Sequence, residues 1–174
     1  IARASGKMIR IAHASNEIHP GHKLATSFQD ALEDILPGGF NVQIFPNRQL
    51  GGDKQVLEAT VAGSLEMSMV SGVLIPLVTG RPAYDAWQLP FLVRDYDHFE
   101  KIALSPAGQK LQDDLEPAGI IGLATADIGQ RNFLSVNSQV RSVADMAGLK
   151  TRIVPVPLHK AIWEALGTAP AGLP

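Results

Sequence analysis

The chain has 174 residues, of which 45% are hydrophobic and 18% are charged, and its formal net charge is -2 at pH 7. This composition is ordinary for a globular protein, and the length suits one large domain or two small ones. No run of basic residues is present to form a surface for nucleic acid or for an anionic membrane, so the sequence argues against both partners. The chain has no cysteine, which excludes disulfides and cysteine-based metal, haem or iron–sulfur sites within it.

The N-terminal residues 1–14, IARASGKMIRIAHA, contain no apolar stretch long enough for a signal peptide or a membrane span. Two interpretations of this are open. Either the protein is cytosolic, or the sequence is the mature form of an exported protein whose precursor carries a signal peptide.

Strand and helix patterns alternate through the first half of the chain. Strands are predicted at 8–14, 40–45 and 64–70, where apolar residues gather or alternate with polar ones. A helix at 22–36 follows Pro20 and Gly21, and its apolar residues recur at helical spacing. A second helix within 51–63 has Asp53 as its expected N-cap.

The second half continues the alternation after a proline-rich passage. A helical stretch at 96–116 is predicted, capped by Asp95 and interrupted near Pro106. Further elements are expected in the order of strands at 119–128 and 133–137, a short helix beginning at Ser142, a strand at 150–154 and a helix at 158–167. This order predicts an α/β fold with a largely parallel sheet.

The C-terminal residues 166–174, LGTAPAGLP, are typical of a helix end that leads into another element. The piece from about Thr125 onward has only about 50 residues, which is at the lower edge of independent stability. We therefore divide the chain into 1–124 and 125–174 and expect a further C-terminal part.

Two arginines have no negative charge near them in the sequence. Arg152 lies in a predicted strand, and positions 148–162 contain no acidic residue. Arg131 follows a predicted strand, and positions 129–143 are equally free of acidic residues. A guanidinium forms two parallel charge-assisted hydrogen bonds with a carboxylate, so both arginines are candidates for binding an anionic ligand. The alternative is that they are solvated surface residues.

Other polar candidates lie at predicted strand ends, where α/β folds bind ligands. His13 could donate to a bound oxyanion, and Ser71 could face the same cleft, although each could equally be an ordinary polar residue of a strand end. Asn132, beside the second arginine, could add amide hydrogen bonds or close a turn. His19 and His22 could be imagined as a metal pair, but nothing else in the sequence supports that.

Enzyme motifs are missing. The segment FPNRQLGGDK has two glycines but is neither a Walker loop nor a dinucleotide fingerprint. No GxSxG elbow and no HExxH helix occurs. We therefore expect no catalytic residue, no metal and no cofactor.

Four segments, in this order, are FPNRQLGGDKQVLEATVAGSLEMSMVS, WQLPFLVRDYDHFEKI, GQRNFLSVNSQVRSVADMAGLKTRIV and ALGTAPAGLP. Together they resemble the extracytoplasmic solute receptors of tripartite ATP-independent periplasmic (TRAP) transporters. The similarity runs from about Ile9 to Pro174. Its most specific parts are F-P-N-x-Q-L-G-G and D-M-x-G-L-K-x-R, about 100 residues apart.

The resemblance implies a periplasmic-binding-protein-like α/β fold of two domains with a cleft. The stretch 1–124 would be the first lobe and 125–174 the beginning of the second, and family chains continue well past this end. It also implies a bacterial periplasmic receptor, expected to be a monomer. Such a receptor closes on a small organic carboxylate and delivers it to the TRAP membrane permease.

The resemblance also assigns site residues. In that family the arginine after GLK forms the salt bridge to the ligand carboxylate, and the matching residue is Arg152. An arginine some twenty residues earlier commonly reaches the ligand and matches Arg131. Polar residues at the ends of the first and third strands line the site, which points to His13 and Ser71. After its GLK arginine this chain has IVP, where the family often has a proline and a polar residue, which suggests a more apolar wall.

Two other functions stay open. One is an enzyme that acts on a small carboxylic acid with His13 as general base, although the sequence offers His13 no evident carboxylate partner. The other is a sensor domain that uses the same fold to report ligand occupancy to a signalling partner.

Overall fold

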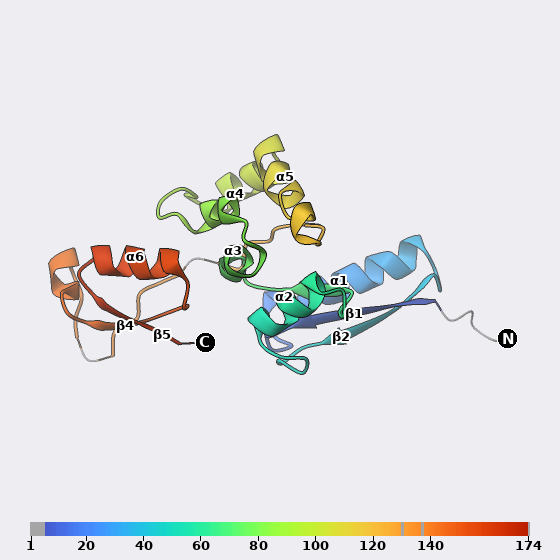
Figure 1. The fold of residues 1–174 in the computed structure, drawn as a ribbon, viewed down its shortest axis with the longest axis horizontal. Coiled ribbons are helices and arrows are strands. Elements are labelled where there is room, and N and C mark those ends of the chain that lie inside the picture. The colour runs from blue at the N-terminus through green and yellow to red at the C-terminus, as the bar shows by residue number, and fades with distance from the viewer. Residues whose placement is uncertain (1–5, 130, 137, 174) are drawn as a thin grey trace. The chain divides into compact units, whose positions relative to one another are not determined.

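The computed structural model describes residues 6–129, 131–136 and 138–173. The chain forms two compact units, Ile1–Ile128 and Gly129–Pro174 (Figure 1). The boundary predicted after residue 124 concerns the lobes of a complete receptor and stays a prediction.

A three-stranded parallel sheet forms the centre of the first unit. β1 (Lys7–His13) is the middle strand, between β2 (Phe40–Phe45) and β3 (Met67–Met69). The three predicted strands, their parallel pairing and the α/β class are confirmed. Because β2 and β3 lie on opposite sides of β1, the strand order reverses there. In such sheets, ligands bind beyond the carboxyl ends of the strands at the reversal.

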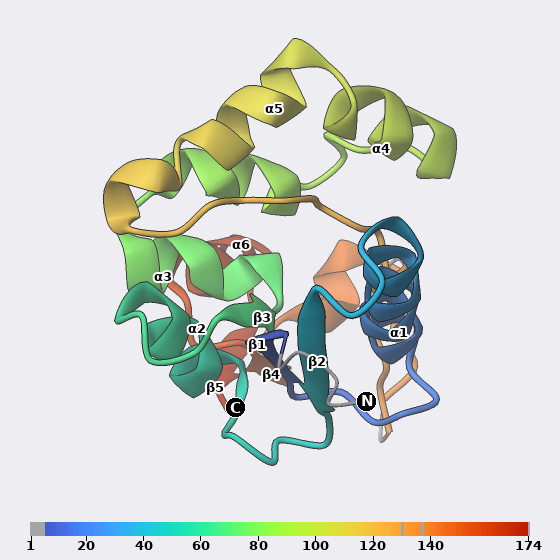
Figure 2. The same ribbon diagram turned by 90° about the vertical axis from the view of Figure 1, so that its right-hand side faces the viewer.

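The helices α1 (Pro20–Ile35) and α2 (Asp53–Val61) connect these strands and pack against them (Figure 2). The sequence predicted that Pro20 and Gly21 precede α1, but the helix already begins at Pro20. Proline fits the first helical position because its fixed φ is helical and no partner is needed there for an N–H group. His19 caps the helix, and its Nδ1 accepts a hydrogen bond from the Gly21 N–H at 3.0 Å.

The rest of the first unit is built from short helices. They are η1 (Gly72–Leu74), α3 (Ile75–Thr79), η2 (Pro82–Gln88), α4 (Tyr96–Ala103), α5 (Pro106–Asp113) and η3 (Glu116–Ala118). Asp95 caps α4 as predicted, with Oδ1 accepting from the His98 N–H at 2.8 Å. The predicted interruption near Pro106 is also confirmed, because Ser105 caps a new helix there. Among the described residues, none of the helices has both the length and the hydropathy that a membrane span needs.

Two apolar clusters fill the first unit, and both contact the partly buried Val70. α2 contributes Val56 to one cluster and Leu57 to the other, so this short helix joins the sheet to the helices that follow β3. The buried members are Ala12, Val56 and Leu65 in the first cluster, and Leu57, Ile75, Tyr84 and Leu115 in the second.

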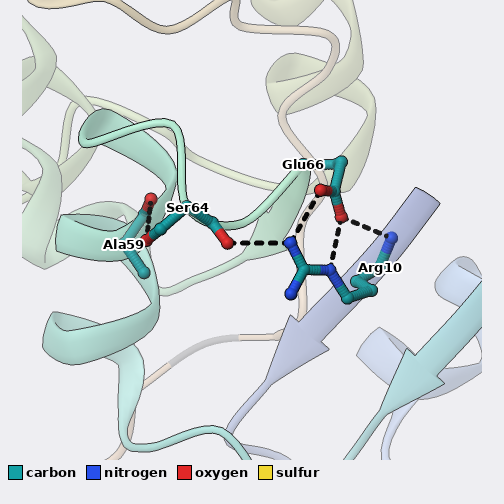
Figure 3. A network of polar contacts seen from close by, with 4 residues as sticks. All are labelled: Arg10, Ala59, Ser64 and Glu66. Carbon is teal, nitrogen blue, oxygen red and sulfur yellow. Dashed lines mark hydrogen bonds and ion pairs between the residues drawn. The ribbon is translucent and has the colours of Figure 1, made fainter. Parts of the chain in front are cut away.

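An ion pair ties β1 to the residues that lead into β3 (Figure 3). The guanidinium of Arg10 donates to both carboxylate oxygens of Glu66, from Nε at 2.8 Å and from Nη2 at 2.7 Å. Nη2 also donates to the carbonyl of Ser64 at 2.8 Å, and the backbone N–H of Arg10 donates to Glu66 at 3.0 Å. One arginine thereby holds the start of β3 in register beside the middle strand.

The apolar run 119–128 is not the strand that the sequence predicted. It crosses the first unit as an irregular segment (gold to orange in Figure 2). Thr125 anchors it, because its hydroxyl lies 2.9 Å from that of Tyr84 and accepts from the amide of Gln112. Ile121 and Leu123 are 74% and 67% exposed. A strand needs a neighbour in a sheet, and no described strand pairs with this run.

The second unit has a two-stranded parallel sheet, β4 (Lys150–Ile153) and β5 (Ala169–Gly172), connected by α6 (Pro157–Ala165). The short 3-10 helix η4 (Val143–Met146) precedes β4, so the predicted helix after Ser142, the strand and the last helix are confirmed.

The second unit also contains the run 133–136, which is irregular and not part of the predicted strand; the last residue of that prediction, at 137, lies outside the described residues. Leu134 and Val136 are 88% and 95% exposed, and the described sheet gives them no neighbouring strand. The ring of Phe133 packs on Trp163 of α6, with centres 5.6 Å apart.

Candidate ligand-binding site

His13 lies at the carboxyl end of the middle strand, as predicted, but its ring is covered. The residue is 2% exposed. Its Nε2 lies 3.1 Å from Nδ1 of His22, the third residue of α1, and the two ring centres are 5.3 Å apart. Its other nitrogen, Nδ1, is buried and has no hydrogen-bond partner among the described residues. The structure therefore pairs His13 with a second histidine, while ligand contact by His13 stays a prediction.

The surroundings of His13 favour its neutral form. Burial lowers the pKa of His13 below its ordinary value of 6.5, and the neighbouring His22 and His19 lower it further. The backbone of Ser15 and the carboxylate of Asp53 act in the opposite direction. A neutral imidazole has one N–H donor and one bare acceptor nitrogen, so the two histidines can share one N–H···N hydrogen bond.

The motif segment FPNRQLGG wraps around the same end of β1. The N–H of Asn47 donates to the carbonyl of Ser15 at 2.9 Å, and the N–H of Arg48 donates to the carbonyl of His13 at 3.4 Å. Both Asn47 and Arg48 have left-handed backbones, with φ of 54° and 59°. Side chains make this conformation unfavourable, so it persists where the surroundings fix it. The most distinctive motif of the sequence therefore shapes the backbone beside His13.

Ser71 reaches the same edge of the sheet. It follows β3, which runs parallel to β1 with Met69 opposite His13. The backbone N–H of Ser71 donates to Oδ2 of Asp53 at 3.3 Å. Asp53 was predicted as the N-cap of α2, but Gly52 occupies that position, and the Asp53 carboxylate holds the chain after β3 instead. The structure thus brings the predicted residues His13 and Ser71 to neighbouring strand ends.

Arg152 lies on the exposed side of β4, between the buried Thr151 and Ile153. Ala171 of β5 is opposite it in the strand register. In the described part of the chain, no hydrogen bond or ion pair engages its guanidinium. The absence of acidic neighbours in sequence therefore holds in space as well.

Arg131 and Asn132 are exposed in the irregular segment that opens the second unit. The Arg131 guanidinium has no acidic partner within the ranges that the structure describes. Arg131 and Asn132 precede Arg152 by about 20 positions in the same unit. Their contact with a ligand stays a prediction.

One pocket of the first unit lies apart from the predicted site residues. It has a volume of about 390 Å³ and is lined by residues of α4 together with Leu104, Thr125 and Asp127. Considering the described residues, no three acidic or histidine side chains are placed to hold a metal ion. His19, once imagined as a metal ligand with His22, uses its ring to cap α1.

The residue that sequence reasoning missed is His22. Its place in the segment HPGH was visible, but the segment gave no reason to join it to His13, nine positions earlier. Because the helix begins at Pro20, His22 lies in its first turn, where its ring contacts that of His13. A helix beginning after Gly21 would not have put His22 at this position of the first turn.

Comparisons with known proteins show the family to which this α/β chain belongs. Residues 11–174 match the family described as bacterial extracellular solute-binding protein, family 7, and the chain belongs to this family. It is 33% identical over 170 residues to the C4-dicarboxylate-binding periplasmic protein DctP of Rhodobacter capsulatus. That match covers 97% of this chain and 50% of the relative, so the chain spans about half the relative's length.

Solved structures agree with this assignment. A TRAP periplasmic solute-binding protein of Xanthobacter autotrophicus Py2, with bound β-D-galacturonate, matches with a TM-score of 0.88 and 28% identity over 95% of this chain and 55% of that one. The sugar acid binding protein DctPAm of Advenella mimigardefordensis, in complex with galactonate, matches with a TM-score of 0.89 and 26% identity over 98% of this chain and 54% of that one. The resemblance to TRAP solute receptors and the periplasmic-binding-protein fold are thereby confirmed.

Proposed function

We propose that this chain is the ligand-recognition part of a periplasmic receptor that captures a small organic carboxylate and delivers it to a TRAP membrane permease. Arg152 forms the salt bridge to the carboxylate, and Arg131 provides a second contact. His13, Ser71 and Asn132 line the site. In such a receptor, 1–124 would be the first lobe and 125–174 the start of the second, and the working form would be a monomer.

The observation that carries this proposal is the unengaged guanidinium of Arg152 in a chain of this family. Arg10, by contrast, has a structural role, since both carboxylate oxygens of Glu66 accept hydrogen bonds from its guanidinium. Arg152 is exposed and has no such partner in the described ranges. Each hydrogen bond between charged groups contributes about 1.5–3 kcal/mol, so a bidentate pair supplies a large part of the roughly 8 kcal/mol of a micromolar complex.

The proposed ligand class follows from chemistry that the relatives share. The Xanthobacter and Advenella proteins hold galacturonate and galactonate, and the Rhodobacter protein is named for C4-dicarboxylates. All of these carry a carboxylate, which is the group that an arginine fork recognises. We therefore propose that the ligand is an organic acid and that the arginine recognises its carboxylate.

An enzyme with His13 as general base is the weaker candidate. A base needs an open path to the substrate proton, and His13 is 2% exposed and hydrogen-bonded to another imidazole. The family is one of solute-binding proteins. We propose that the protein binds its acid without changing it, and that a sensor role would depend on a fused signalling segment.

The test is calorimetric titration of the protein and of Arg152→Ala with galacturonate, galactonate and succinate. We expect at least one acid to bind, and Arg152→Ala to weaken that acid by at least about tenfold, because two charge-assisted hydrogen bonds are lost. Arg152→Lys should also bind poorly, since an ammonium group cannot form the parallel pair.

The matched control is Arg141→Ala, which removes the same charge from an exposed residue of the same unit whose guanidinium is bonded to Gln139. It should bind like the unaltered protein. Unchanged affinity in Arg152→Ala would refute the role of Arg152. Equal losses of affinity in Arg152→Ala and Arg141→Ala would show that the effect comes from net charge and not from a specific contact.

A further inference from the structure

The two rings of the pair His13–His22 differ in their access to the outside. His13 is 2% exposed, whereas His22 is only partly buried in the first turn of α1. His13 points Nε2 at Nδ1 of His22, at 3.1 Å. This leaves Nε2 as the free nitrogen of His22, which no described residue engages. Of the two rings at the carboxyl end of β1, that of His22 is therefore the more accessible to a ligand.

The backbone at this end of α1 has little hydrogen-bonding capacity left. The Gly21 N–H is taken by the ring of His19, at 3.0 Å, and the N–H groups of His22 and Lys23 lie 2.9 and 3.4 Å from the carbonyl of His19. A helix start attracts anions through its free N–H groups, and here those groups are already used. Nε2 of His22 is a side-chain nitrogen at the start of α1 that has no hydrogen-bond partner among the described residues.

His13 fixes what that nitrogen can do. The contact between Nε2 of His13 and Nδ1 of His22 can run in either direction, according to the tautomer. In the tautomer in which a neutral His13 donates from Nε2, Nδ1 of His22 is the acceptor and the proton of a neutral His22 sits on its Nε2, and this is the form that the inference requires. The second nitrogen of a paired imidazole sets its tautomer and ring orientation. His13 is also held at its position, because it is buried and the N–H groups of Asn47 and Arg48 bond the carbonyls of Ser15 and His13.

We infer that His22, through Nε2, is the ligand-contacting member of the pair, and that His13 is the positioning residue that orients it. This rests on the proposed function and reassigns the contact predicted for His13. The group that His22 would meet is an oxygen acceptor of the bound organic acid, a carboxylate or hydroxyl oxygen.

Substitution by asparagine or by glutamine can replace one of the two ring nitrogens of a histidine and remove the other. The amide of asparagine occupies the position of Nδ1, and the amide of glutamine reaches that of Nε2. His22→Asn therefore keeps the bond to His13 and loses the outward donor, while His22→Gln keeps the outward donor. At position 13 the pattern reverses, because His13 faces its partner with Nε2: His13→Gln keeps the pair and His13→Asn breaks it.

The experiment is calorimetric titration of these four variants with galacturonate, galactonate and succinate, with folding checked by circular dichroism. We expect His22→Asn to bind about fivefold more weakly, because it loses the outward donor, and His22→Gln to bind about twofold more weakly, because it keeps that donor but not the bond to His13. We expect His13→Gln to stay within about twofold of the unaltered protein, and His13→Asn, which also breaks the pair, to lose about as much as His22→Gln.

The matched control is His98, which is also a partly buried third residue of a helix, α4, and accepts from the Arg94 N–H through Nδ1 at 3.3 Å. His98→Asn and His98→Gln should bind normally. Full affinity in His22→Asn, equal losses in both His22 variants, or equal losses at position 98 would each overturn the inference. The expected histidine pattern together with an unaffected Arg152→Ala would refute the arginine contact alone, and no binding of any acid by the unaltered protein would refute both.

Discussion

Arg10 differs from Arg131 and Arg152 in what surrounds its guanidinium. Arg10 is surrounded by acceptors, with Glu66 and the carbonyl of Ser64 on its guanidinium (Figure 3). Arg131 and Arg152 are exposed and lack acidic neighbours in the residues described. The first kind serves the fold and the second is available to a ligand, so substitution at the two kinds should affect different measurements.

The carboxylate of Glu66 should make stability depend on acid. Its side-chain hydrogen bonds with Arg10, followed by the bond from the Arg10 backbone, lower the pKa of Glu66 from about 4.5 to about 2. Because the folded pKa lies below the unfolded one, the ionised carboxylate stabilises the fold above pH 4.5, and this contribution is lost as the pH falls from about 4.5 to about 2. Glu66→Gln should melt below the unaltered protein at pH 7, with a difference that narrows toward pH 2.

Circular dichroism melts across that pH range measure this difference. The control is Glu58→Gln, which removes an exposed carboxylate 3.6 Å from Lys54 and should change the melting temperature little. A difference between Glu66→Gln and the unaltered protein that stays constant with pH would contradict the assigned pKa.

Helix starts and close contacts define the elements of the first unit. His19, Asp95 and Ser105 each accept an N–H of the helix that they cap. Between α4 and α5 the chains approach so closely that a Cβ on Gly108 would lie 2.5 Å from the carbonyl oxygen of Ala103 and would also meet that of Ile102. Glycine at this position is therefore what allows α5 to pack on the end of α4.

Gly108→Ala should destabilise the protein by about 1–3 kcal/mol, the cost of forcing atoms into a filled space, even though alanine favours helices. Urea unfolding followed by circular dichroism measures this. Gln109→Ala, at the next and exposed position of α5, should stay within about 0.5 kcal/mol. If Gly108→Ala were as stable as the unaltered protein, the close approach of α4 and α5 would be in error.

Elements that depend mainly on their own residues and on the residues directly beside them could be predicted from the sequence. β2 has the predicted bounds because its alternation is enclosed by Pro-Gly-Gly on one side and Pro46 on the other. The cap at Asp95 and the break before Pro106 follow from the same kind of local chemistry. The run 119–128 was mistaken for a strand because strand formation depends on a neighbour, which apolar composition alone does not supply.

At the scale of the whole molecule, the candidate site was only partly predictable. Strand ends and bare arginines are visible in sequence, which is why His13, Ser71 and Arg152 could be proposed. The pairing of His13 with His22 depends on how α1 returns against β1, and no spacing rule states that. Burial of His13 could not be predicted either, because it depends on segments that are distant in sequence, including the turn at Asn47, returning to the end of β1.

A cognate acid should stabilise the molecule. At a free concentration one hundred times its dissociation constant, a ligand that binds only the folded protein adds about 2.7 kcal/mol to the free energy of unfolding. Thermal-shift measurements with galacturonate, galactonate, gulonate and succinate would identify it. Galactose, which has no carboxylate, is the control, and equal stabilisation by galactose and galacturonate would contradict recognition of the acid group.

The placement of the two tryptophans has an optical consequence. The chain has two, Trp87 in contact with Phe99 in the first unit and Trp163 in contact with Phe133 in the second. Trp87→Phe and Trp163→Phe would each leave a single fluorophore that reports on one unit only. Emission spectra recorded during heating would then reveal whether the two units melt together or one after the other, without any attached dye.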